Sequence, residues 1–128
     1  MALPVVRSLK DSTLNCFTPS LATSPVAAQM VVPFSGRIIK TQGVSYGTTT
    51  GTTTISVAIN GGTAISSAAL SIAAGGAGVE VESTITTSDY NASQVKDGDV
   101  ISFTPSGGTG SSIGGTFHAL IRRNQSDG

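Results

Sequence analysis

Short runs in which apolar and polar residues alternate recur along most of this chain. The clearest run covers residues 53–59, where Ile55, Val57 and Ile59 are separated by polar or small residues. A period of two places successive side chains on opposite faces of a β-strand. The sequence Asn60-Gly61-Gly62 follows and is typical of a hairpin turn, so we predict a strand over 53–59 that ends there.

The second half of the chain carries two more clear runs. In residues 113–123, every second residue from Phe117 to Ile121 is apolar. In residues 100–103, Ile101 and Phe103 share one face. This run follows a Gly-containing turn at 96–99. We therefore predict a strand for each run, and a long one for the run at about 113–123.

Residues 79–85 show the same alternation with charges on one side. We expect Val79, Val81 and Ile85 to face inward, while Glu80 and Glu82 face water. A strand with one wet face indicates an antiparallel sheet, because parallel sheets are usually covered on both faces.

The remaining runs are shorter, and none has the length of a stable helix. A single helical turn is expected between Asp89 and Gln94, and brief strands are expected at 31–34, 37–40, 63–65 and 69–72. About eight strands at spacings of roughly 8 to 12 residues predict an all-β fold, an antiparallel, jelly-roll-like β-sandwich.

Residues 1–24 differ from the rest because they contain Pro4 and Pro19 and place their apolar residues at irregular spacing. We expect an extended N-terminal arm over 1–24 and the sandwich domain over 25–128. The apolar residues of such an arm need burial, either against a neighbouring subunit or as a flap over the chain's own core.

Charge and composition narrow the classes of partner. Seven basic residues balance seven acidic ones, and charged residues make up 11% of the chain. Nothing here favours nucleic acid as a partner, because no basic excess would attract its phosphates. A near-neutral surface rich in Ser, Thr and Gly suits a protein that associates with copies of itself or docks on a larger body.

The N-terminal region predicts neither export nor membrane insertion. Arg7, Lys10 and Asp11 interrupt the apolar stretch that a secretory signal would need, and no segment approaches the length of a membrane span. Synthesis in a cytoplasm is expected. The single cysteine, Cys16, cannot form an intrachain disulfide and is interpreted as a small buried hydrophobic residue.

The sequence offers no constellation for catalysis. Its only histidine, His118, alternates out of phase with the core-facing residues of the last run, so it should lie at the surface or in an interface. A nucleophile needs a base within reach, and zinc needs more ligands than one His and Cys16 supply. We expect no enzyme activity, no cofactor and no metal.

The carboxylates admit weak alternatives. Asp97 and Asp99 flank Gly98 as in a calcium loop, but the full ligand spacing is missing and a tight turn explains the residues. Glu80 and Glu82 lie on one strand face, about 7 Å apart, and are interpreted as solvated charges rather than as a glycosidase pair.

Two glycine-rich stretches and a threonine cluster complete the candidates. Residues 75–78 and 107–110 lack the helix and the Lys-Ser/Thr ending of phosphate loops and are expected to be loop tips. The cluster from Thr48 to Thr54 is interpreted as polar padding of a sheet edge or as a receptor or glycan contact surface.

Two stretches, Pro33–Ile38 and Val95–Phe103, resemble small capsid decoration, or cement, proteins of tailed bacteriophages. The resemblance extends over the Thr/Gly/Ala-rich middle and the closing run at 115–122. It implies a jelly roll that forms homotrimers on the capsid exterior and clamps neighbouring major capsid subunits. It implies no catalytic, cofactor-binding or metal-binding residues.

The resulting hypothesis is a structural virion protein, made in the host cytoplasm and located on the capsid surface. Its partners would be the major capsid protein, bound through the arm and one loop-bearing end, and further copies of itself, bound through strand faces that carry Phe, Val and Ile. The alternative is a receptor- or glycan-binding domain of a phage fibre or tail, which would use Thr48–Thr54 and the loop Gly107–Gly115.

Overall fold

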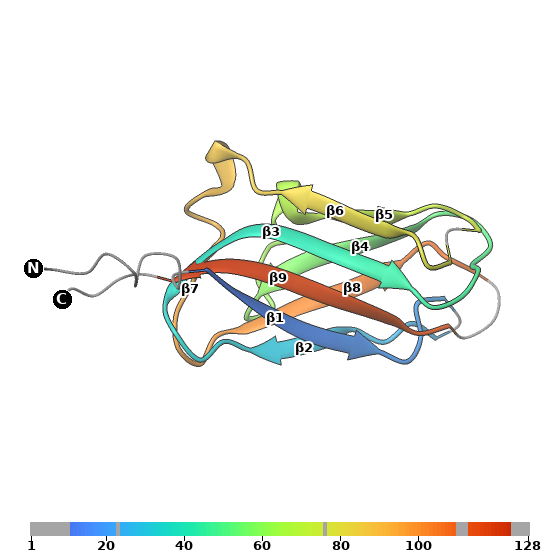
Figure 1. The fold of residues 1–128 in the computed structure, drawn as a ribbon, viewed down its shortest axis with the longest axis horizontal. Helices are drawn as coiled ribbons and strands as arrows, with labels where there is room; N and C mark the ends of the chain where they lie inside the picture. The colour runs from blue at the N-terminus through green and yellow to red at the C-terminus, as the bar shows by residue number, and fades with distance from the viewer. Residues whose placement is uncertain (1–10, 23, 76, 110–112, 124–128) are drawn as a thin grey trace, which may run out of the picture.

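The computed structural model describes residues 11–22, 24–75, 77–109 and 113–123, which fold into two antiparallel β-sheets packed face to face (Figure 1). The described residues form nine strands and two short 3-10 helices. These are β1 (Asp11–Thr18), β2 (Ala28–Val31), β3 (Gly36–Ser45), β4 (Thr53–Ile59), η2 (Ser66–Ala68), β5 (Leu70–Ile72), β6 (Glu80–Thr84), η3 (Thr87–Asp89), β7 (Gln94–Val95), β8 (Val100–Ser106) and β9 (Gly115–Arg123).

Each sheet is assembled from strands far apart in the sequence. The first has the order β1-β9-β3-β6, with β7 also pairing with β3, and the second has the order β2-β8-β4-β5. All pairings between these strands are antiparallel. The predicted all-β, jelly-roll-like sandwich is therefore confirmed.

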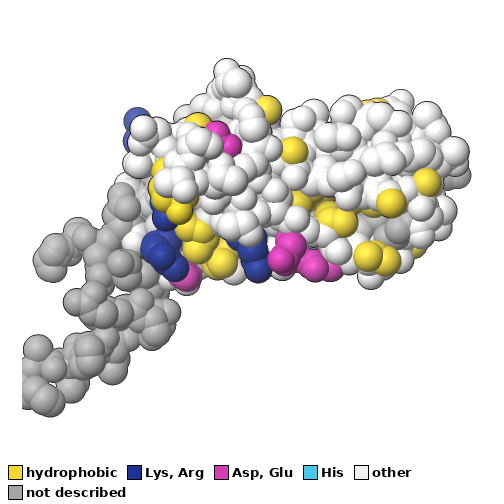
Figure 2. Space-filling model, turned by 90° about the horizontal axis from the view of Figure 1, so that it is seen from above, with side chains coloured by type: hydrophobic (Ala, Val, Ile, Leu, Met, Phe, Trp, Pro, Cys, Tyr) yellow, Lys and Arg dark blue, Asp and Glu magenta, His cyan; other side chains and the backbone are white. Residues whose placement is uncertain are grey.

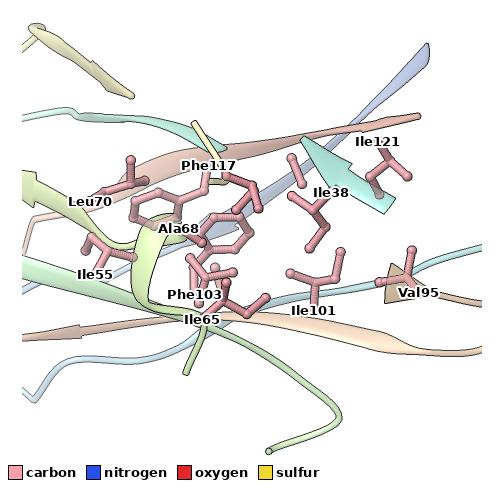
Figure 3. Packing of buried hydrophobic residues seen from close by; sticks show 14 of the residues in the cluster. Ile38, Ile55, Ile65, Ala68, Leu70, Val95, Ile101, Phe103, Phe117 and Ile121 are labelled. Carbon is pink, nitrogen blue, oxygen red and sulfur yellow. The ribbon is translucent and has the colours of Figure 1, made fainter. Parts of the chain in front are cut away.

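The core lies between the sheets and centres on two phenylalanines (Figure 3). Phe103 of β8 and Phe117 of β9 are fully buried, and their rings stack with centroids 5.1 Å apart and an interplanar angle of 7°. Gly43 of β3 lies directly opposite Phe117 in the strand pairing. A side chain at position 43 would begin 2.6 Å from the Phe117 ring, so glycine makes room for the aromatic pair.

The strand predicted over 53–59 coincides with β4, and the turn after it is confirmed. Asn60 and Gly61 both have positive φ, and the Gly62 N–H donates to the Ile59 carbonyl across the turn. The brief strand predicted at 63–65 does not form. Its one backbone bond to β4 comes from Ile65, after which η2 intervenes before β5.

Residues 11–22 are part of the sandwich rather than of an arm. β1 pairs with β9 along its whole length, from Asp11 opposite Arg122 to Thr18 opposite Gly115, and Leu21 is fully buried. Any arm is therefore confined to residues 1–10, which lie outside the described residues. The sequence of 11–18 hides its strand period, because two of its four inward-facing residues are polar while Phe17 faces outward. The inward-facing residues are Ser12, Leu14, Cys16 and Thr18.

One smaller prediction is corrected and another is confirmed. Val79 was expected to face inward, but it precedes β6 and is 58% exposed, whereas Val81 is half-buried and Ile85 is buried. The single helical turn expected between Asp89 and Gln94 is present, since the Ser93 N–H donates to the Asp89 carbonyl (3.0 Å), and a 3-10 helix at Thr87–Asp89 precedes it.

Candidate interaction surfaces

Four loops meet at one end of the sandwich, which we call the loop end and define by its described residues, 19–22, 24–27, 47–52, 73–75, 77–79, 107–109 and 113–114. Backbone hydrogen bonds join them. Thr50 and Thr109 exchange two N–H···O=C bonds of 2.9 Å, the Gly75 N–H donates to the Thr49 carbonyl, and the Leu21 N–H donates to the Ile113 carbonyl. The loops form one connected surface, because each is bonded to another loop or to a strand end.

The loop end contains no charged residue in its sequence. Figure 2 shows this from one side, where the Lys, Arg, Asp and Glu side chains lie away from the right-hand end of the molecule. Exposed apolar side chains gather here instead. Val26 is 46% exposed and Val79 is 58% exposed, and at its margin Phe17 and Tyr46 are 55% and 58% exposed.

The threonine cluster of residues 48–54 is divided by the fold. Thr49 and Thr53 are buried, whereas Thr48, Thr50, Thr52 and Thr54 are exposed. The structure brings the exposed hydroxyls beside the loop that begins at Gly107, because the bridge between Thr50 and Thr109 connects the two segments. The two segments that a receptor- or glycan-binding function would use, Thr48–Thr54 and the loop that begins at Gly107, are thus adjacent.

The opposite end carries charge, and its turns explain the Asp97-Gly98-Asp99 sequence. The buried Asp99 carboxylate accepts hydrogen bonds from the Asn60 side-chain amide (3.0 Å) and from the Lys96 N–H (3.0 Å). These hydrogen bonds hold the pKa of Asp99 below its usual value. Each carboxylate oxygen of Asp99 therefore accepts a hydrogen bond that stabilises the turns at this end.

No group of three or more His, Cys, Asp or Glu side chains suited to a metal ion occurs within the described ranges. None of the helices in the described part of the chain has the length and apolar character needed to cross a membrane.

The two sheets differ in charge. No residue of β2, β4, β5 or β8 is charged, so the outer face of that sheet presents short side chains such as Ser56, Ala58 and Thr104. The charged strand residues all belong to the other sheet, as they occur on β1, β3, β6 and β9.

A row of planar polar side chains crosses the outer face of the charged sheet. Asn15, His118, Gln42 and Glu82 are consecutive cross-strand partners on β1, β9, β3 and β6. The Asn15 amide oxygen accepts from Nδ1 of His118, and the Gln42 amide donates to Glu80 (2.9 Å) and Glu82 (3.5 Å). His118 is therefore in a surface row, as its phase in the sequence indicated.

An aromatic pair lies beside this row. Phe17 and Tyr46 stack with centroids 5.8 Å apart, and the Tyr46 hydroxyl is hydrogen-bonded to Thr116. Because Phe17 is two residues along β1 from Asn15, the pair and the polar row are about 7 Å apart on the same face. Lys40 of β3 forms an ion pair with Glu82, 3.4 Å away. Glu80 and Glu82 are thus solvated, as expected, but tied to Gln42 and Lys40.

Cys16 packs against the core from β1 and is half-buried. Burial raises the pKa of its thiol to about 12, so the thiol stays protonated at neutral pH. This agrees with its interpretation as a small hydrophobic residue.

Sequence reasoning missed both the aromatic pair and the polar row. Phe17 belongs to the segment expected to be an arm, and Tyr46 belongs to none of the predicted strands. The only local signal was the alternation Thr13, Asn15 and Phe17, which marks one face of a strand once the segment is read as β.

Comparisons with known proteins bear on the fold. No protein-family model matches this chain, and no curated protein matches it. A chain from the capsid of Ralstonia phage GP4 is similar in structure, with a TM-score of 0.56 and 16% identity over 91% of this chain and 86% of that chain. At this identity the similarity shows a shared fold.

Two carbohydrate-binding modules also align. The module CBM36, solved with calcium and xylotriose, has a TM-score of 0.43 and 12% identity over 74% of this chain and 70% of its own. The module CBM6-3 of Clostridium stercorarium, solved with cellobiose, has a TM-score of 0.47 and 13% identity over 77% and 67%.

Proposed function

We propose that this protein is a structural component of a bacteriophage virion, which decorates the capsid exterior by docking its loop end on major capsid subunits. The observation that carries the proposal is the uncharged loop end with its exposed apolar side chains. Burying such a surface costs little, because no charge has to leave water, and the centres of protein interfaces are depleted in charge in the same way.

Two further observations support a capsid location. The fold is shared with a chain from the capsid of a phage. The two stretches that resemble cement proteins are also neighbours in space, because Gly36 and Arg37 of the first pair with Val95 and Gln94 around the start of the second.

The first described residue, Asp11, lies at the opposite end of the sandwich from the loop end. β1 begins at the charged end, where Asp11 pairs with Arg122, and runs toward the loop end. β1 has eight residues and is therefore about 26 Å long, so Asp11 lies about that far from the loop end. We assign the capsid contact to the loop end and regard the arm as a separate contribution.

Copies of the chain are proposed to associate through the uncharged β2-β8-β4-β5 sheet, with a trimer as the cement-protein resemblance implies. Its outer face carries only uncharged side chains, most of them short, so two copies can approach closely without burying an ion.

The alternative function, receptor or glycan binding by the loop end, rests on the adjacency of Thr50 and Thr109. Hydroxyl groups alone give this surface few directed contacts for a sugar, and none of its residues has a carboxylate or a guanidinium. The loop end therefore fits a protein partner better.

A new carboxylate at two exposed positions tests the docking surface. We expect Val26→Asp to reduce occupancy on capsids at least about tenfold, because a carboxylate buried in an apolar contact is strongly unfavourable. Thr84→Asp is the control, since Thr84 is also exposed but lies on β6, outside both the loop end and the uncharged sheet. Occupancy is measured by co-sedimentation with capsids of the parent phage assembled without this protein.

Equal loss in both variants, or in neither, would reject the loop end as the docking surface. Binding of the isolated protein to host cells through the loop end, without affinity for capsids, would favour the alternative.

A further inference from the structure

We infer that the outer face of the charged sheet is a binding site for a neutral oligosaccharide. This inference goes beyond capsid decoration, because it concerns a face that neither the loop end nor the uncharged sheet uses. It rests on two features that lie side by side: the exposed aromatic pair Phe17 and Tyr46, and the polar row Asn15, His118, Gln42 and Glu82.

The aromatic pair supplies a platform of fixed orientation. Tyr46 is held from two sides, by ring stacking on Phe17 and by the hydrogen bond between its hydroxyl and Thr116. A sugar ring presents a face of C–H groups, which carry a small positive charge and pack favourably on the negative face of an aromatic ring. Both rings are more than half exposed and so are accessible to such a ligand.

The polar row supplies hydrogen-bonding groups of the kind that vicinal hydroxyls need. Carboxylates accept bonds from sugar hydroxyls, while amides and imidazoles can both donate and accept. The row is preorganised, because Asn15 bonds His118 and Gln42 bonds both Glu80 and Glu82. Less side-chain entropy is lost when a ligand binds groups that are already ordered.

The dimensions suit a short chain of sugars. Four strands spaced about 4.8 Å apart give the row a length of about 14 Å, and the aromatic pair is about 7 Å to its side. A flat ligand can therefore contact the rings at one margin and the polar groups along its length.

The charges on this face determine the class of ligand. Glu80 and Glu82 share this face with Lys40 and Arg122, whose charges are balanced by Glu82 and Asp11. The face therefore offers sialylated or sulfated glycans no excess of positive charge, and the ligand should be uncharged. A flat protein partner would have to desolvate these carboxylates together with Lys40 and Arg122, which protein interfaces avoid at their centres. An oligosaccharide can leave part of each charged group in water.

The experiment uses the full chain, first on an array of neutral and anionic glycans and then by calorimetry with the neutral oligosaccharides that bind. We expect Gln42→Ala and Tyr46→Ala each to weaken binding by about tenfold or more. The controls remove the same side-chain types elsewhere: Gln29→Ala on β2 of the other sheet, and Tyr90→Ala at the charged end. The controls should bind like the wild type.

Three results would overturn the inference: no neutral glycan binds, binding survives both Gln42→Ala and Tyr46→Ala, or anionic glycans bind preferentially. A loss of oligomer mass in Gln42→Ala and Tyr46→Ala, without glycan binding by the wild type, would assign the face to a protein contact instead. These results concern glycan binding alone. Capsid docking is measured separately, by the occupancy of Val26→Asp on particles.

Discussion

Gly43 controls how the centre of the core is filled. Its missing side chain leaves the space in which Phe117 lies against Phe103, and the nearest Phe117 ring atoms are 2.6 Å and 2.9 Å from where a Cβ would be. Contacts this short do not occur between real atoms, so any larger residue at position 43 must displace an aromatic ring that is itself fully buried.

We therefore expect Gly43→Ala to lower the free energy of unfolding by about 1–3 kcal/mol, the usual cost of overpacking a core. Urea denaturation followed by fluorescence or circular dichroism measures it. In a double-mutant cycle, Phe117→Leu should cost less in the Gly43→Ala background than in the wild type, because the smaller side chain relieves the clash.

Thr84→Ala serves as the control at an exposed position on β6. Additive effects of Gly43→Ala and Phe117→Leu would contradict the steric explanation.

At the scale of single elements, the strands with strict alternation could be predicted from the sequence, and β1 could not. β4 and β9 bury an apolar residue at every second position, and β8 was located from Ile101 and Phe103. β1 turns only Leu14 and Cys16 inward as apolar side chains, and the exposed Phe17 obscures its period. Its strand conformation depends on pairing with β9, which is 100 residues away and invisible to a local pattern.

The role of β1 predicts different outcomes for two truncations. Deleting residues 1–10 should leave the melting temperature within about 3 °C of the wild type, because the sandwich begins at Asp11. Deleting residues 1–24 should lower it by more than about 10 °C or prevent folding, since β9 loses its partner and the buried Leu21 is removed.

Thermal denaturation followed by circular dichroism distinguishes the two truncations. A stable, folded protein lacking residues 1–24 would show that β1 is dispensable. Capsid occupancy of the protein lacking residues 1–10 then measures what the arm adds.

At the scale of the whole molecule, the surface is divided between charged and uncharged regions. The loop end and one sheet carry no charge, while the other sheet and the opposite end carry all the charged residues of the described part of the chain. The sequence contains this division, but it becomes visible only when the strand order is known. The turns that form the loop end were predicted individually, and their meeting at one end follows from the topology.

The uncharged sheet makes a prediction about assembly. We expect Thr104→Lys, on the outer face of β8, to shift the mass in solution from oligomer toward monomer, because the interface would then bury an unpaired ammonium group. Thr13→Lys is the matched control, an exposed threonine on the outer face of β1 in the charged sheet, and should keep the oligomer.

Light scattering coupled to size-exclusion chromatography measures both variants. A monomeric wild type, or an oligomer unaffected by Thr104→Lys, would reject association through this sheet.

The course of the first and last strands has a practical consequence. β1 starts and β9 finishes at the same pole, with Asp11 and Arg122 joined by two hydrogen bonds, while the uncharged loops occupy the other pole (Figure 1). Cargo fused directly before Asp11 or after Arg123 would thus be carried on the far side of the sandwich from the proposed capsid contact. Particles coated with such fusions would display that cargo outward, without obstructing attachment.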